Sequence, residues 1–163
     1  MLAYVSWHRP ARDVDPGAYE QALVSFHRSL GHRPPSGFRG SAAFRASEAH
    51  WLASVAGARG AGASYEDWYL VDGWSAVGVL EEAAVARGHV SRHDALAAMA
   101  DVAKGAVYRL SEGHPRLAEA RVGVWVTRAP GHAPVTIGDL LGDGMDRQAA
   151  GLWRRSSAGR GRE

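Results

Sequence analysis

The pattern of apolar and polar residues at the start of the chain predicts a short strand. Side chains at alternate positions of a strand point to opposite faces, and residues 2–8 alternate in this way. One face would carry Ala3, Val5 and Trp7, and the other Tyr4, Ser6 and His8.

An amphipathic helix is predicted next, beginning after Asp15. Its carboxylate suits the N-cap position, where it accepts hydrogen bonds from unpaired N–H groups, and Pro16 suits the first helical position. Gly31 is the expected end of the helix. Apolar residues at helical spacing form one stripe: Tyr19, Leu23, Phe26 and Leu30.

Two more strands are predicted in the middle of the chain, at residues 38–46 and 65–71. The inward face of the first is expected at Phe38, Gly40, Ala42, Phe44 and Ala46. The second, YEDWYLV, is aromatic and aliphatic, and the break at Asp72-Gly73 changes the apolar period from that of a strand to that of a helix. This helix is predicted to bury Trp74, Val77, Leu80 and Ala84. Residues 47–63 are expected to contain a loop or the tip of a hairpin.

The second half of the chain predicts one more helix and one more strand. Ser91 and Asp94 resemble a capping box, and the apolar spacing after them predicts a helix over residues 91–112. The sequence RVGVWVTR alternates and predicts the last strand, at residues 121–128. Residues 1–128 are therefore expected to form one domain. Residues 129–163 are expected to be an extension with a short segment near 136–141, an anchor at Leu152 and Trp153, and a basic tail that is a candidate for disorder.

The order of these elements predicts an α+β fold. The order is strand, helix, strand, strand, helices, strand. With right-handed crossovers, this order gives a ferredoxin-like fold: a four-stranded antiparallel sheet with helices on one face. The other face needs a cover, and a second copy of the chain is a natural one.

The strand residues Trp68-Tyr69, followed by the Asp72-Gly73 turn and a helix rich in Leu and Ala, resemble the dimeric α/β-barrel superfamily. That group includes antibiotic-biosynthesis monooxygenases, haem-degrading enzymes and proteins similar to muconolactone isomerase. The resemblance covers residues 2–128 and is architectural. It implies a homodimer in which two sheets share one barrel, and it carries over no active site residue by residue.

Composition narrows the function. The 163 residues suffice for about one domain, and the chain has no cysteine, which excludes disulfides, thiolate nucleophiles and iron–sulfur clusters. No apolar run is long enough to cross a membrane, and no signal peptide is recognisable, so a cytoplasmic protein is expected. The net charge is +2 and arginines crowd the last ten residues, so the basic charge indicates a solvated tail and nucleic-acid binding is not expected.

Candidate catalytic residues come from the predicted strands. Glu66 and Asp67 point to opposite faces and cannot form a paired-carboxylate dyad. Asp67 with His8 and an arginine is the predicted catalytic constellation, and Tyr69 is a third candidate. The structural alternatives are a histidine bonded to backbone or solvent, and a buried ion pair between a carboxylate and one of Arg39, Arg45, Arg121 and Arg128.

Candidate ligand-binding residues are mainly aromatic, because large rings with a polar tip suit a flat, apolar ligand. Core packing explains most of these rings equally well. They are Tyr4, His27, Arg45, Trp68 and Trp125. His89 and His93 are four residues apart, but a helix boundary between them favours a solvated surface over a metal site.

The sequence lacks the phosphate-binding motifs GxxxxGK[ST] and, after a strand, GxGxxG. It also lacks the GxSxG nucleophile elbow, and no histidine pair has the spacing of a metal site.

Two functions therefore stay open. One is a small cofactor-independent enzyme, of the monooxygenase, cyclase or isomerase type, acting on an apolar aromatic or polyketide-like substrate. The other is a non-catalytic dimeric protein that binds a ligand or haem, with His8 or His27 as the haem ligand.

Overall fold

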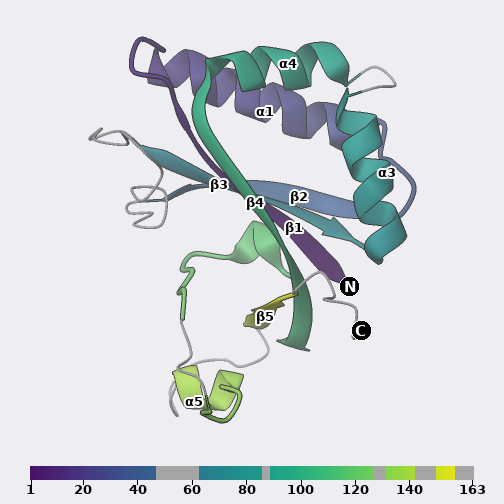
Figure 1. Cartoon of the computed structure of the whole chain (residues 1–163), viewed down its shortest axis with the longest axis vertical. Helices are drawn as coiled ribbons and strands as arrows, with labels where there is room; N and C mark the ends of the chain where they lie inside the picture. Colours follow the sequence, from purple (N-terminus) through teal and green to yellow (C-terminus); the bar gives the residue numbers. More distant parts are fainter. Residues whose placement is uncertain (47–62, 86–88, 127–130, 142–149, 157–163) are drawn as a thin grey trace.

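The chain forms one antiparallel sheet, with helices in several of the connections between its strands (Figure 1). The computed structural model describes residues 1–46, 63–85, 89–126, 131–141 and 150–156. The elements are β1 (Leu2–Pro10), α1 (Pro16–His32), β2 (Phe38–Ala46), β3 (Ser64–Val71), α3 (Trp74–Val85), α4 (Val90–Met99), β4 (Ala100–Gly113), the 3-10 turn η1 (Leu117–Glu119), α5 (Ile137–Leu141) and β5 (Gly151–Arg155).

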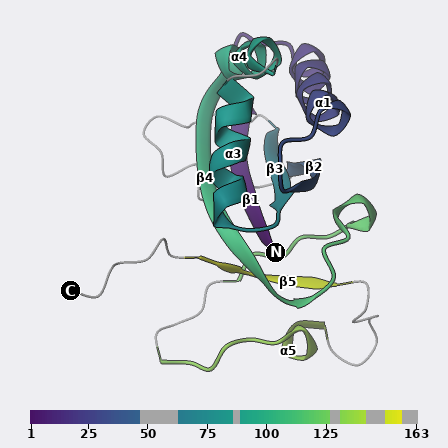
Figure 2. The ribbon, with the colours of Figure 1, turned by 90° about the vertical axis from the view of Figure 1, so that its right-hand side faces the viewer.

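The sheet order is β2-β3-β1-β4-β5, and all neighbouring strands are antiparallel. The first four strands with their helical connections have the β-α-β-β-α-β arrangement of the ferredoxin-like fold. Within the described residues the sheet has five strands rather than the predicted four, because β5 pairs with the outer edge of β4. Helices α1, α3 and α4 lie on one face of the sheet (Figure 2).

Helix α1 agrees with its prediction. The Asp15 carboxylate accepts a hydrogen bond from the Ala18 N–H at 2.8 Å, so the N-cap satisfies one of the unpaired donors of the first turn. The helix ends at His32, one residue beyond the expected Gly31. All the residues of the predicted stripe are buried: Tyr19, Leu23, Phe26 and Leu30.

The helix predicted over residues 91–112 is wrong in its second half. Helix α4 ends at Met99, and the chain continues at Ala100 as the strand β4. Residues 100–109 of β4 pair with β1. Gly105 lies in this strand, opposite Ser6, and the Tyr4 side chain of β1 fills the space where a Cβ at position 105 would lie. Pairing with the otherwise open edge of β1 therefore outweighs the helical pattern of the sequence.

The strand predicted over residues 121–128 is also wrong. Residues 121–126 form no strand, and β4 occupies the place in the sheet that they were expected to take; residues 127 and 128 lie outside the described ranges. Val122, Val124 and Val126 are exposed, at 78%, 75% and 52%. The alternating pattern alone did not make a strand, because β4 already pairs with the edge of β1 that this segment was expected to occupy.

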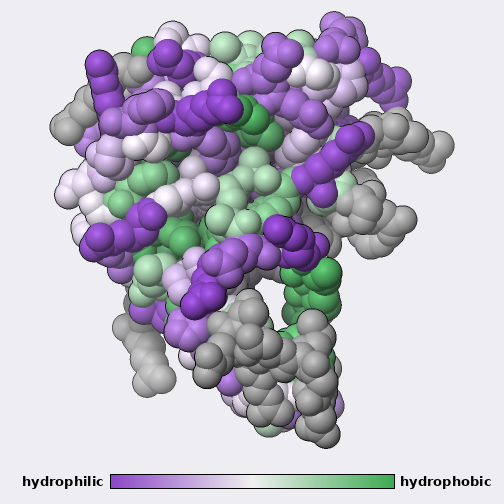
Figure 3. Space-filling model, turned by 180° about the vertical axis from the view of Figure 1, so that it is seen from behind, coloured by the Kyte–Doolittle hydropathy of each residue, from purple (hydrophilic) through white to green (hydrophobic). Residues whose placement is uncertain are grey.

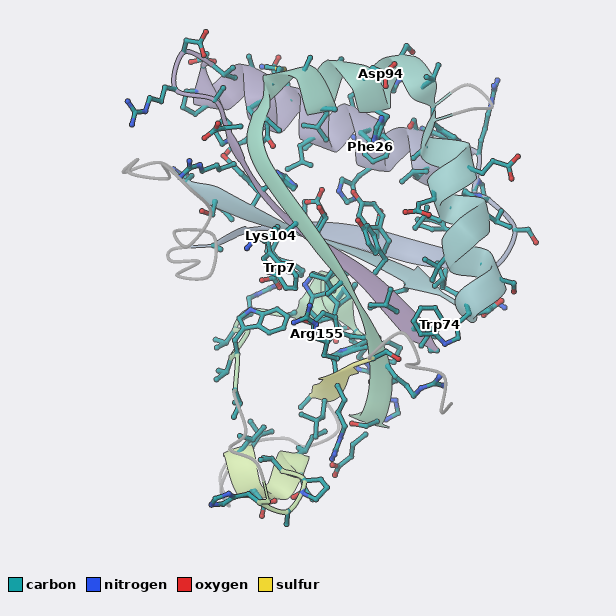
Figure 4. All side chains as sticks on the ribbon, in the orientation of Figure 1. Trp7, Phe26, Trp74, Asp94, Lys104 and Arg155 are labelled. Atoms are coloured by element: carbon teal, nitrogen blue, oxygen red, sulfur yellow. The ribbon has the colours of Figure 1, made fainter. Side chains whose placement is uncertain are left out.

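Two apolar clusters lie on the two faces of the sheet. The helix-side cluster joins β1 and β3 to the stripe of α1 and to Ala76, Leu80 and Leu96. The outer cluster contains Ala3, Val5, Trp7, Trp68, Leu70 and Tyr108, with Trp153 packed against it. The predicted faces of the first strand are therefore confirmed. Trp74, predicted as buried, is 46% exposed because it is the first residue of α3 and lies at its open end (Figure 4).

A bulge in β2 changes which of its residues face the helices. Phe38 is opposite Val71 and Gly40 is opposite Leu70, so the register shifts by one residue between them. Phe38 consequently packs on the helix side, whereas Phe44 packs on the outer side. The prediction of a single inward face containing both phenylalanines is wrong. Beyond the bulge, Ser41 shares the helix-side face with its cross-strand partner Tyr69.

Candidate functional site

Asp67 on β3 is the centre of a polar cluster buried under the helices. It is 2% exposed, and its Oδ2 atom lies 2.9 Å from His8 Nε2 and 3.3 Å from His27 Nε2. The Tyr69 hydroxyl donates a hydrogen bond to the same oxygen at 3.0 Å. β1, α1 and β3 thus each bring a polar side chain to one carboxylate, and we call Asp67, His8, His27 and Tyr69 the carboxylate cluster.

Two opposing effects set the pKa of Asp67. Burial raises it, because it disfavours a charge, while the contacts with His27 and His8 lower it. The result is a pKa of about 2, so Asp67 is a carboxylate anion at neutral pH. The cluster therefore keeps a fixed negative charge between two imidazole rings.

Two tyrosines define where the protons of the cluster lie. Burial, together with the charge of Asp67, raises the pKa of Tyr19 and of Tyr69, so both phenols keep their protons at neutral pH. The Tyr19 hydroxyl lies 2.6 Å from His8 Nδ1 and donates a hydrogen bond to this nitrogen, because the Asp67 anion holds the ring proton on Nε2. In neutral His8 the ring proton is then on Nε2, next to Asp67.

The second oxygen of Asp67 differs from the first. Oδ1 is buried and has no hydrogen-bond partner among the residues that the structure describes, whereas Oδ2 is close to both imidazoles and the Tyr69 hydroxyl. Neither Nε2 atom makes a hydrogen bond of good angle within that same part of the chain. Such unsatisfied buried atoms are rare in folded proteins, and a catalytic role is one explanation for them.

The structure brings four of the predicted site residues together and adds two that sequence reasoning missed. His8, Asp67, Tyr69 and His27 share the cluster, and the Tyr4 ring lies 6.1 Å from the Tyr69 ring. Tyr19, interpreted as core alone, and Ser41, not considered, also contact it. For Tyr19 the only available signal was a hydroxyl in an otherwise apolar helix stripe, one turn from the N-cap.

The predicted arginine partner of Asp67 is not found among the described residues, which do not include Arg128. His27 takes that place beside Asp67, while Arg39 forms an exposed ion pair with Asp72 at 2.6 Å. Arg45 is exposed at the end of β2, on the same face as Tyr65.

Trp68 and Trp125 do not reach the carboxylate cluster, because they lie on the outer face of the sheet. There the Glu66 carboxylate accepts hydrogen bonds from the indole N–H groups of Trp7 at 2.9 Å, Trp68 at 2.5 Å and Trp125 at 3.1 Å. The ring centroids of Trp7 and Trp125 are 5.2 Å apart. Glu66 and Asp67 thus lie on opposite faces of the sheet, as the alternation of the strand predicts. The hydrogen bond from Trp125 to Glu66 connects the segment after β4 to the sheet.

A surface groove of about 620 Å³ lies away from both carboxylates, over α1 and the start of α4. Its lining includes Glu20, Val24, Arg28, His89 and Arg92. The described ranges contain no group of three or more histidine, cysteine or acidic residues arranged to hold a metal ion. The chemistry on the helix side therefore rests on the carboxylate cluster.

Of the helices in the same ranges, none is long and apolar enough to span a membrane.

Comparisons with known proteins agree with the fold and assign no function. No family model matches the sequence, and no curated protein matches it. Among solved structures, the protein At3g17210 of Arabidopsis thaliana matches with a TM-score of 0.51 at 10% identity, over 70% of this chain and 99% of that one.

Two more distant structures, from Thermobifida fusca and Bacteroides fragilis, are described as dimeric, ferredoxin-like and of unknown function. Their TM-scores are 0.45 and 0.46, at 13% and 14% identity. Each match covers 65% of this chain, and 87% and 92% of the other chains. Such low identities concern the fold alone, and the strand order of this chain is that of a ferredoxin-like protein.

Proposed function

We propose that the protein is a small cofactor-independent enzyme that moves a proton on an apolar, aromatic or polyketide-like substrate, in a reaction of the isomerase, cyclase or monooxygenase type. The observation that supports this is the carboxylate cluster: a buried anion, Asp67, in contact with two imidazoles. Imidazole is the side chain best suited to accept and return a proton near neutral pH.

Asp67 would act by stabilising charge. When His8 accepts a proton it becomes an imidazolium, and an anion 2.9 Å away in a buried site stabilises that cation more than water does. Because the pKa of Asp67 is about 2, the carboxylate does not itself become protonated during the reaction. Asp67 therefore keeps its charge throughout and faces the ring that takes the proton.

The surroundings of the cluster support an apolar substrate with a polar group. The Tyr65 ring stacks on His8 with centroids 5.9 Å apart, and the Phe26 ring lies 6.4 Å from that of Tyr69. Asp67 Oδ1, which has no partner in the described part of the chain, suits a substrate hydroxyl or enol as an acceptor. Flat aromatic compounds with an acidic C–H next to a carbonyl combine both features.

The partner that we propose is a second copy of the chain, joined through the outer face of the sheet. Trp125 and Trp153 cover part of this face within one chain. Val122 and Val124 beside them are 78% and 75% exposed. Seen from behind, the rest of the surface is mainly hydrophilic, with separate apolar patches (Figure 3). Burying this remaining apolar surface favours association.

Hydrogen–deuterium exchange tests the enzymatic proposal without knowledge of the product. Flat aromatic ketones and β-diketones are incubated with the protein in D₂O, and loss of the C–H signal next to the carbonyl is followed by NMR. We expect the protein to accelerate exchange for at least one compound. His8→Gln should slow this exchange by about 10²- to 10⁴-fold, because it removes the base.

His114→Gln is the matched control, because His114 is exposed and lies outside the carboxylate cluster. It should leave the exchange rate unchanged. Equal exchange rates in wild type and His8→Gln, with both proteins folded by circular dichroism, would show that the cluster only stabilises the fold.

The alternative is a ligand-binding or haem-binding protein without catalysis. Haem ligation by His8 would require a free ring nitrogen, yet Nδ1 accepts from Tyr19 and Nε2 contacts Asp67. The Tyr19 contact must likewise open before His8 takes a proton from a substrate, so these contacts do not distinguish the two functions. A sharp Soret band on adding haemin, abolished by His8→Ala or His27→Ala, would support haem binding instead.

A further inference from the structure

We propose that Ser41 is a nucleophile, activated by His27 and Asp67, that takes an acyl group from an ester or thioester. This is a second reactivity of the same cluster and does not require the proton transfer proposed above. It rests on a chain of contacts that ends in a hydroxyl group, the arrangement by which serine is made nucleophilic in acyl-transfer enzymes.

The contacts run from β2 through α1 to β3. Ser41 Oγ lies 2.7 Å from His27 Nδ1, and His27 Nε2 lies 3.3 Å from Asp67 Oδ2. The order hydroxyl, imidazole, carboxylate allows the ring to take the serine proton while the anion stabilises the imidazolium that forms. The second contact is longer than a full hydrogen bond, as is often found before a substrate binds.

The bulge in β2 decides which side chain meets His27. With regular alternation from Phe38, the residues on the helix-side face would be Gly40 and Ala42. The register shift between Phe38 and Gly40 places Ser41 on this face instead, opposite Tyr69. A bulge that re-aims one side chain is common beside active sites.

A substrate can approach Ser41 from the sheet edge. β2 is an edge strand of the described sheet, and Ser41 is half-buried rather than enclosed. His27 is likewise only partly buried, with 12% of its side chain exposed. The hydroxyl and its base therefore lie at the open end of the carboxylate cluster.

The chain also contains a natural comparison. Ser29 Oγ lies 3.0 Å from His89 Nδ1, but the other nitrogen of this ring faces the Arg33 carbonyl oxygen at 3.2 Å instead of a carboxylate. Ser29 also donates its own proton to the Phe26 carbonyl oxygen at 2.7 Å. Ser29 therefore has a histidine neighbour without the anion, and we expect no activation there.

The reaction proceeds in two steps. Ser41 Oγ attacks the acyl carbonyl carbon, its proton passes to His27, and the alcohol or thiol leaves with that proton as the bond from carbonyl carbon to leaving group breaks. Water then attacks the acyl-serine, gives a proton to His27, and Ser41 leaves with that proton as the carboxylic acid is released. Each step returns the imidazole to its neutral form.

Covalent labelling tests the assignment. Wild-type protein is treated with p-nitrophenyl acetate or with a fluorophosphonate, and the adduct is located by peptide mass spectrometry. We expect one adduct, on Ser41, absent in Ser41→Ala and unchanged in Ser29→Ala. His27→Gln should slow labelling by about 10²- to 10⁴-fold. Labelling of Ser41→Ala at the wild-type rate, or no adduct at pH 8, would overturn the proposal.

Cysteine variants provide a second readout that is independent of turnover. The chain has no cysteine, so Ser41→Cys and Ser29→Cys each introduce a single thiol. The thiol at position 41 should react with iodoacetamide at lower pH than the thiol at position 29, because a charged imidazole lowers a thiol pKa. Identical pH profiles for the two thiols would contradict activation by His27 and leave the exchange experiment on His8 unaffected.

Discussion

Asp67 is the residue on which most of the polar contacts of the helix side converge. Its carboxylate is buried, ionised and in contact with His8 and His27 from two different elements. A buried anion of this kind must be compensated, since an unpaired one costs several kcal/mol. The cluster therefore stabilises the fold only while Asp67 is charged.

The pH dependence of stability follows from this. The pKa of Asp67 falls from 3.8 to about 2 on folding, so between these values the unfolded chain binds more protons than the folded one. The free energy of unfolding should therefore fall as the pH is lowered from about 4 to 2, by roughly 2 kcal/mol from this group. Urea denaturation of wild type and Asp67→Asn at several pH values measures it, and the variant should lack this component.

Asp94→Asn is the control for this measurement. Asp94 contacts His93 at 3.1 Å, but its side chain is 66% exposed, so the pair is screened by water. Its removal should leave the acid slope as in wild type. An unchanged slope in Asp67→Asn would mean that Asp67 has the same proton affinity in the folded and unfolded chains.

At the scale of elements, β4 is where local preference and tertiary structure disagree. Leu96, Met99, Val107 and Leu110 follow helical spacing, yet residues from Ala100 onward pair with β1. A strand pairs with its neighbour through hydrogen bonds that no sequence window contains. β3 occupies one edge of β1, and pairing with the other edge determined the structure of this segment.

Gly105→Ala distinguishes the two structures by the sign of its effect. In a helix, alanine would stabilise the protein by up to about 1 kcal/mol relative to glycine. In β4 the new methyl group would clash with the Tyr4 side chain, and we expect a loss of about 1–3 kcal/mol in the free energy of unfolding. Thermal or urea unfolding measures the change.

Tyr4→Leu provides the companion variant, since it removes the phenol that fills the space above Gly105. The double variant Tyr4→Leu/Gly105→Ala should be less destabilised than the sum of the two single changes. Additive losses would show that the methyl group and the phenol do not meet.

At the scale of the whole molecule, the two faces of the sheet have different roles. The helix side encloses the carboxylate cluster, and the outer side carries the Glu66 carboxylate with its tryptophans and an exposed row of valines. An edge of exposed apolar side chains beside a packed aromatic cluster is typical of an interface. This arrangement supports the proposed homodimer.

Light scattering tests the dimer directly. The wild type should have a mass of twice the 17.4 kDa chain at micromolar concentration. Val124→Asp should weaken association at least tenfold, because it places a charge on the proposed interface. Val24→Asp is the control, since Val24 is also exposed, at 44%, but lies on α1. A wild-type monomer at all concentrations would exclude the shared barrel.

The sequence by itself determined what depends on short-range physics. Asp15, Pro16 and the four-residue stripe defined α1, and strict alternation placed Glu66 and Asp67 on opposite faces of β3. These features depend on residues only a few positions apart. Which of the two carboxylates shares a face with His8 depended on the register between β1 and β3.

Only the tertiary structure decided the rest. The end of α4 at Met99, the pairing of β5 and the place of His27 beside Asp67 depend on which strand edges and helix faces meet. The bulge before Ser41 shifts the register by one residue and exchanges the faces of β2. Such choices are made between segments far apart in the chain, where no local pattern sets the free energy.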